Sequence, residues 1–347
     1  MRNKLSRLAA GLTVAALGIG LAGCADSGSA TQANSGDATV IAVAGLTNLH
    51  NIPLVLADEL GYFEEEGVNV QLSDLQSGTK ALEAVESGSA PIAASFYDHT
   101  LRMQSKGRGY TSFVVLSDSP GAVLATPPSS SGEVTSIADL KGQPVGIAAP
   151  GSAEQAYFEQ ALQENGMELS DVSLVTTGTG SSAVAAMEGG QVVAGWMFEP
   201  AFSQFEARND GTGILIDTRT REGTTELFGE GGYAAETLYT KNEWLEANPD
   251  TAQAIVNATV RAIKWMHEHT AEEIAEAMPQ DLIGDDFDSY VDVLDKNLEI
   301  YTDDGLMPEG GYEANVQLLE SAEGLTDLRP TETFTNEYAE KANEASE

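Results

Sequence analysis

The stretch that decides the fold runs from Thr39 to Leu72 and reads TVIAVAGLTNLHNIPLVLADELGYFEEEGVNVQL. Its first apolar run, residues 40–43, predicts a strand. Pro53 comes early in the next segment, where the missing N–H of a proline costs a helix little, and apolar residues then recur at helical spacing over 56–63. Residues 68–72 alternate between apolar and polar, as in a strand with one buried face. The stretch therefore predicts a strand–helix–strand unit with parallel strands.

The same alternation continues along the chain. Further strands are expected at residues 91–95, 113–116, 145–149, 173–175 and 191–197, and further helices from Thr79, Asp98 and Ser152 and around residues 182–187. After about residue 248 helical patterns dominate, and Thr270 with Glu273 predicts a capping box at the start of one helix. Alternating strands and helices predict an α/β protein with parallel or mixed sheets flanked by helices.

Two Gly-rich breaks predict a division into two lobes. The Pro-, Ser- and Gly-rich stretch Thr126–Ser136 is interpreted as the first crossing between lobes, and Gly229–Gly232 as the return. Residues 38–126 would then form the first part of lobe 1, residues 127–228 lobe 2, and residues 229–347 the return to lobe 1 with the C-terminal helices. Two α/β lobes joined by two crossings predict a clamshell that closes on a ligand by hinge motion.

The first residues predict export. Three basic residues are followed by an apolar run, Leu8–Leu21, that is too short to span a bilayer as a helix, which is the build of a secretory signal peptide over residues 1–23. The run ends in Leu-Ala-Gly-Cys24, which resembles the lipobox of bacterial lipoproteins. That resemblance implies cleavage before Cys24 and lipidation of its sulfur, with residues 24–37 as a flexible tether. The alternative for Cys24 is a buried or reactive thiol.

Charge and cysteine content exclude several classes. The chain carries a net charge of −37, and losing residues 1–23, which hold three cations and no acids, would make it −40. Such a field argues against nucleic acid or anionic lipid as a partner. Because Cys24 is the only cysteine, no intramolecular disulfide and no Cys-based metal site is expected.

Candidate ligand-binding residues follow the expected strands, because ligands of open α/β sheets bind beyond the carboxyl ends of the strands. In the first lobe, side chains and backbone after three strands are the candidates. Asn48 and His50 offer hydrogen bonds, Ser77, Gly78 and Thr79 form a corner that favours anions, Tyr97 offers a ring for stacking, and Asp98 a carboxylate or a helix cap. Ordinary helix capping remains the alternative for the Ser77–Thr79 corner.

In the second lobe the run Gly151, Ser152, Ala153 is the most specific candidate. Ser152 and Gln155 fit a capping box, and the preceding glycine leaves N–H groups suited to a carboxylate or sulfonate. Further along, Trp196 and Glu199 end a strand, and Tyr233 follows the return crossing. Glu199 is expected to accept from an amine or amide of the ligand.

Several runs in this order resemble the solute-binding family that takes nitrate, sulfonates, taurine and thiamine-pyrimidine precursors. They are residues 53–70 (P-x3-A-x3-G-Y-F-x3-G-V-x-V), 136–142 (SIADLKG), 145–152 (VGIAAPGS), 199–200 (EP) and 303–308 (DDGLMP). The resemblance implies a type II periplasmic-binding-protein fold and delivery of the ligand to an ABC permease with its ATPase. The chain departs from the family at Ala90 and Val193, where an Asp is common.

Together these features predict an extracytoplasmic lipoprotein, anchored through Cys24 to the outer face of the cell membrane or in the periplasm. We expect a monomer without cofactor that captures a small polar organic solute, either sulfonate- or taurine-like or pyrimidine-precursor-like. Two alternatives stay open. One is a receptor that signals to a membrane partner. The other is an enzyme resembling the fungal pyrimidine synthase, whose Cys-rich segment has no counterpart after Cys24.

Overall fold

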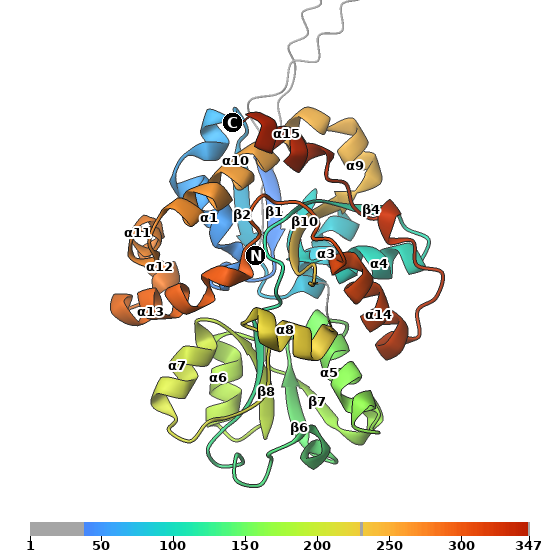
Figure 1. Ribbon diagram of the computed structural model, residues 1–347, viewed down its shortest axis with the longest axis vertical. Helices are drawn as coiled ribbons and strands as arrows, with labels where there is room; N and C mark the ends of the chain where they lie inside the picture. Colours follow the sequence, from blue (N-terminus) through green and yellow to red (C-terminus); the bar gives the residue numbers. More distant parts are fainter. Residues whose placement is uncertain (1–37, 230–231, 346–347) are drawn as a thin grey trace, which may run out of the picture. The chain divides into compact units, whose positions relative to one another are not determined.

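The computed structural model describes residues 38–229 and 232–345 (Figure 1). Cys24 and the predicted signal peptide and tether lie outside the described residues, as do two residues of the predicted return crossing. The described part belongs to one compact unit that starts at Gly36. It contains two five-stranded mixed sheets, each flanked by helices, so the predicted α/β class is confirmed.

The first sheet has the strand order β2-β1-β3-β10-β4. Its strands are β1 (Thr39–Val43), β2 (Val70–Asp74), β3 (Ile92–Phe96), β4 (Tyr110–Val115) and β10 (Glu236–Lys241). β1 pairs in parallel with β2 and β3, as the opening stretch predicts, whereas β10 runs antiparallel between β3 and β4. The helices of this lobe are α1 (Ile52–Glu59), α2 (Tyr62–Glu65), α3 (Gly78–Ser87), α4 (Asp98–Ser105), α9 (Asn242–Ala247), α10 (Pro249–Glu268) and α15 (Glu337–Ala345).

The second sheet has the order β7-β6-β8-β5-β9. Its strands are β5 (Ala122–Thr126), β6 (Pro144–Ile147), β7 (Ser173–Thr176), β8 (Ala194–Phe198) and β9 (Gly213–Asp217). Around it lie α5 (Ala153–Glu164), α6 (Ser181–Glu188), α7 (Ala201–Arg208) and α8 (Arg221–Phe228), with α6 and α7 on one face and α5 on the other (Figure 1). Apolar side chains of the sheet and of these helices pack together and form the core of this lobe.

The predicted first crossing is wrong. β5 pairs with β8 and β9, so the chain has already entered the second sheet at Ala122. The crossing therefore lies between Val115 and Ala122, and Thr126–Ser136 is a loop within the second lobe. The loop composition signals a break in regular structure, but it carries no information on which sheet the preceding strand joins.

The C-terminal segment also packs against the second lobe. α11 (Ala271–Ala277), α12 (Gln280–Ile283) and α13 (Phe287–Asn297) lie at the first lobe, but α14 (Gly311–Glu323) packs mainly against α5 (Figure 1). Ala314 and Leu318 of α14 belong to the core of the second lobe. The predicted capping box at the start of α11 is confirmed, since Thr270 and Glu273 exchange side-chain-to-backbone hydrogen bonds of 2.9 and 3.3 Å. Among the described residues, no helix is both long and apolar enough to cross a membrane.

Candidate ligand-binding site

A polar cavity lies where the carboxyl ends of strands from both sheets meet. It is lined from the first lobe by Ala44, Asn48, His50, Gln76, Ser77, Gly78, Ser95, Phe96, His99 and Glu236, and from the second by Ala148, Ser152, Ala153, Glu154, Thr179 and Phe198. The inner cavity holds about 30 Å³, room for about two water molecules. An outer cleft of about 280 Å³ adjoins it along shared residues and is bordered by Lys80. The predicted residues Asn48, His50, Ser77, Gly78, Ser152 and Ala153 thus come together from both lobes.

His50 forms one wall of this cavity and is held in a neutral state. Its Nε2 donates to the carbonyl of Pro120 at 2.6 Å, because a carbonyl can only accept, and burial lowers the pKa of the imidazole to about 4. The ring meets Phe96 and Phe198 edge-on, at centroid distances of 5.5 and 5.1 Å. Nδ1 is therefore an acceptor, and the three rings form an apolar wall shared by the two lobes.

His99 lines the cavity from α4 and is also neutral. Burial lowers the pKa of its imidazole to about 4. Its Nδ1 lies 3.0 Å from the Tyr239 hydroxyl and 3.3 Å from Ser95 Oγ, while Nε2 has no protein partner among the described residues. Gly78 makes room for this arrangement, since a Cβ there would lie 2.3 Å from Ser95 Oγ and 2.8 Å from His99 Cε1. The glycine serves the packing of its neighbours as well as the approach of a ligand.

Two buried carboxyl groups face the same cavity. Glu154 comes from the first turn of α5 and Glu236 from the first residue of β10, and they are 4% and 3% exposed. Burial raises the pKa of Glu154, and burial with the nearby charges of Glu154 and Asp98 raises the pKa of Glu236 to about 8. Sequence analysis missed Glu236 because the antiparallel strand that carries it was not predicted.

The described residues that line the inner cavity include no Lys and no Arg. Lys80 borders only the outer cleft. A site with two carboxyl groups, two neutral imidazoles and several hydroxyls accepts hydrogen bonds better than it compensates negative charge. The geometry therefore favours a ligand that presents N–H donors or a positive charge.

Residues 151–155 cap the start of α5 with hydrogen bonds that differ from those of the predicted capping box. Ser152 Oγ accepts from the Gln155 amide at 3.4 Å, but the Gln155 side chain accepts from the Gly151 amide at 3.0 Å instead of from Ser152. Gly151 does not line the inner cavity. Thr79 Oγ1 donates to the Pro150 carbonyl at 3.4 Å, which is a direct contact from the first lobe to the second.

Tyr97 and Asp98 do not line the cavity, so both predictions are wrong in this structure. The Tyr97 ring is fully buried and its hydroxyl lies 2.6 Å from Thr333 Oγ1. Asp98 Oδ2 pairs with Arg102 Nη1 at 2.5 Å, and Arg102 also binds Glu323 of α14 at 2.7 Å. The residues follow β3 as expected, but the turn into α4 directs their side chains into the first lobe.

Trp196 and Tyr233 are core residues, which corrects two further predictions. Both are fully buried, and Tyr233 stacks on Phe228 at a centroid distance of 4.2 Å while Trp196 meets Tyr157 edge-on at 6.1 Å. Trp196 and Phe198 lie on the same face of β8, because side chains two residues apart share a face of a strand. Phe198 is the one at the strand end, so it reaches the cavity and Trp196 does not.

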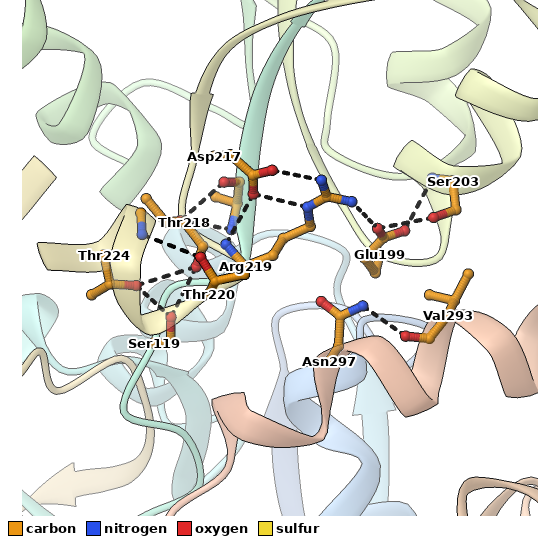
Figure 2. Close-up of polar contacts among 12 residues, drawn as sticks. Ser119, Glu199, Ser203, Asp217, Thr218, Arg219, Thr220, Thr224, Val293 and Asn297 are labelled. Carbon is orange, nitrogen blue, oxygen red and sulfur yellow. Dashed lines mark hydrogen bonds and ion pairs between the residues drawn. The ribbon is translucent and has the colours of Figure 1, made fainter. Parts of the chain in front are cut away.

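Glu199 is occupied within the second lobe and does not line the cavity, so this prediction is also wrong (Figure 2). Its carboxylate accepts from the amide and the hydroxyl of Ser203, both at 3.0 Å, and from Arg219 Nη1 at 2.8 Å. Arg219 is held in turn by Asp217 and lies over the Phe202 ring. Arg219 lies 20 residues downstream of Glu199, so no local sequence pattern predicts this ion pair.

The described residues contain no group of three or more His, Cys, Asp or Glu side chains that could hold a metal ion. What the geometry offers is a two-walled polar cavity whose walls come from different lobes.

The sequence profile of the family described as NMT1/THI5 like matches residues 48–273. The chain belongs to this family. The match covers the opening helix, the second sheet with helices α5 to α8, and all of α10, so every residue that lines the inner cavity except Ala44 lies within it.

Curated relatives of this NMT1/THI5-like chain include the Bacillus subtilis protein YtlA, which is 25% identical over 87% of this chain and 90% of its own. They also include the 4-amino-5-hydroxymethyl-2-methylpyrimidine phosphate synthase of Aspergillus parasiticus, 28% identical over 64% of this chain and 65% of the relative. The relatives thus include enzymes by name.

Solved structures show the same fold. One protein from Bordetella bronchiseptica is 34% identical and covers 90% of this chain and 98% of its own, with a TM-score of 0.85. The alkanesulfonate-binding protein SsuA from Xanthomonas axonopodis pv. citri, at 16% identity, covers 86% of this chain and 97% of its own with a TM-score of 0.65. The predicted periplasmic-binding-protein fold is therefore confirmed.

Proposed function

We propose that this protein is the exported solute-binding component of an ABC importer, anchored through a lipidated Cys24, and that it hands a small polar organic solute to a permease. The observation that carries the proposal is the cavity lined from both lobes, which the two crossings and α14 connect. Such a cavity holds its ligand best when the lobes are closed, and a ligand shifts the open–closed equilibrium by its preference for the closed form.

The character of the cavity supports a pyrimidine-precursor-like nitrogen base over a sulfonate or nitrate. An oxyanion in the inner cavity would meet the buried carboxyl group of Glu154, and above about pH 8 also that of Glu236, with no Lys or Arg among the described lining residues to offset them. A flat aminoheterocycle is larger than the inner cavity of about 30 Å³, so the lobes must part to admit it. Once bound, it would donate to these carboxyl groups and to His50 Nδ1 and would lie against the wall made by Phe96 and Phe198. The Gly151–Ala153 corner loses its role as an oxyanion site in this proposal.

The proposal gives the protein no catalytic activity. The synthase relatives make an enzyme the second candidate, and it is separated from a binding protein by whether a bound aminopyrimidine leaves unchanged. A receptor that signals instead of feeding a permease is separated by co-purification with a permease and an ATPase in detergent.

The test is isothermal titration of the protein with 4-amino-5-hydroxymethyl-2-methylpyrimidine, taurine and nitrate. We expect micromolar or tighter binding of the pyrimidine, recovery of the ligand unchanged, and no heat from the two anions. Tight binding of taurine or nitrate would refute the ligand class, and conversion of the pyrimidine would refute the binding-protein assignment. In cells, a Cys24→Ser variant should lose incorporation of labelled fatty acid and membrane association; retention of both would refute the anchor.

A further inference from the structure

The two cavity carboxyl groups belong to opposite lobes. Glu154 stands on α5 of the second lobe and Glu236 on β10 of the first. Each is at least nine-tenths buried, and each has one oxygen, Glu154 Oε2 and Glu236 Oε1, without a protein partner among the described residues. Any separation of the lobes moves the two groups apart, and any closure brings them together.

The surroundings do not neutralise this pair. Asn51 is the hydrogen-bonding side chain next to Glu236, and Ser152 next to Glu154. Asp98 adds negative charge close to both carboxyl groups, and Arg102 is a cation that acts on Glu154. Arg102, however, is already paired with Asp98 at 2.5 Å and with Glu323 at 2.7 Å.

The imidazoles on the cavity wall do not supply the missing charge either. His50 and His99 are both fully buried, with pKa values lowered to about 4, so they remain neutral from about pH 5 upward. Lys80 reaches only the outer cleft. Closing the lobes with both carboxyl groups ionised therefore places two like charges in a buried cavity, which is costly without a counter-charge.

We propose that Glu154 and Glu236 form a charge-operated clasp: when both are ionised they hold the lobes apart, and the lobes close when N–H donors or a positive charge of the ligand bridge them. This inference deepens the proposed solute-binding function and rests on it for the ligand. It also assigns specificity, because an anion or an uncharged acceptor leaves the repulsion in place. A proton on one of the two groups would mimic the ligand, so acid should close the empty protein.

The test measures lobe separation in the absence of ligand, by fluorescence transfer between dyes on the two lobes. Glu83 of α3 and Ala185 of α6 are exposed, and both helices begin at the outer cleft, so Cys at these positions in a Cys24→Ser background reports the width of its mouth. Four proteins with these dyes are compared: the protein with both Glu154 and Glu236 unchanged, Glu154→Gln, Glu236→Gln and the double variant. Glu164→Gln, an exposed glutamate at the other end of α5, is the matched control.

At pH 9, above the pKa of about 8 of Glu236, we expect each cavity variant to raise the closed-to-open ratio by about tenfold, the change that corresponds to one pKa unit, and the control to leave it unchanged. Lowering the pH to 5.5 should close the unmodified protein and have no effect on the double variant. Circular dichroism and urea unfolding first establish that each variant is folded. With 4-amino-5-hydroxymethyl-2-methylpyrimidine, the unmodified protein should close, whereas the double variant should lose at least tenfold in affinity.

The inference is overturned if the closed-to-open ratio of folded Glu236→Gln and of the double variant equals that of the control, or if pH acts equally on the double variant. Because these readings need no ligand, they separate the clasp from the proposed function. If the variants and pH change the lobe separation as expected but the protein binds none of the tested solutes, the clasp is supported and the ligand class is refuted.

Discussion

Replacing Asp98 by Asn should destabilise the protein, because the structure places this carboxylate in a buried ion pair and away from the cavity. Asp98 Oδ2 lies 2.5 Å from Arg102 Nη1, and the two side chains are 0% and 8% exposed. Breaking a buried pair by removing one partner costs about 3–5 kcal/mol. Arg102 keeps Glu323, which is 26% exposed, and the loss of a negative charge near Glu154 relieves some repulsion, so about 2–3 kcal/mol is expected.

The assay is urea unfolding of Asp98→Asn, Arg102→Met and the double variant, followed by circular dichroism. With a denaturant slope of about 3 kcal/mol per M, the urea midpoint of Asp98→Asn should fall by about 1 M. The double variant should be much less destabilised than the sum of the two single variants, with a coupling of at least about 1.5 kcal/mol. Glu332→Gln, whose pair with Arg329 is exposed on both sides, is the matched control and should leave the midpoint unchanged.

Additive effects of Asp98→Asn and Arg102→Met would refute the reasoning, since they would mean that the pair contributes nothing beyond its separate members. An Asp98→Asn variant as stable as the unmodified protein would do the same, and would return Asp98 to the list of ligand-binding candidates.

Three further changes test other parts of the structure. Glu199→Gln removes the charge that Arg219 binds at 2.8 Å, so the free energy of unfolding should fall by about 1–3 kcal/mol. Affinity for the ligand, measured by titration, should stay within about threefold. A loss of affinity without a loss of stability would contradict the placement of Glu199 outside the cavity. Gly121→Ala adds a Cβ at φ +60°, 2.9 Å from His50 Nε2, and should lower both the urea midpoint and ligand affinity, whereas an unchanged affinity would show that this wall is not used. Burial raises the pKa of Asp118 from 3.8 to about 6. The native state therefore binds this proton more tightly than the unfolded state, and the stability that the group contributes falls as the pH rises from about 4 to 6. Asp118→Asn should be more stable than the unmodified protein at pH 7 by up to about 3 kcal/mol, and equal pH profiles of stability for the two proteins would contradict this prediction.

Much of the fold and part of the site could be predicted from the sequence because they depend on local chemistry. Hydrophobic periodicity reports the type of each element and the order of strands and helices. The rule that ligands lie beyond the carboxyl ends of strands then selected loops that meet in the structure: Asn48, His50, Ser77, Gly78 and Ser152 all line one cavity. These positions follow from chain direction alone, since parallel strands end at the same edge of a sheet.

The tertiary structure alone decided the rest, because it depends on which distant segments pair. β5 and β10 are antiparallel strands whose place in a sheet depends on partners far along the chain, so the first crossing was misplaced and Glu236 was missed. Side-chain direction has the same origin. Trp196 points into the core and Glu199 toward Arg219 because the packing of neighbouring elements sets those directions. The charge of the cavity depends on two carboxyl groups from opposite lobes, with no Lys or Arg among the described residues that line it. This arrangement exists only once the lobes are brought together.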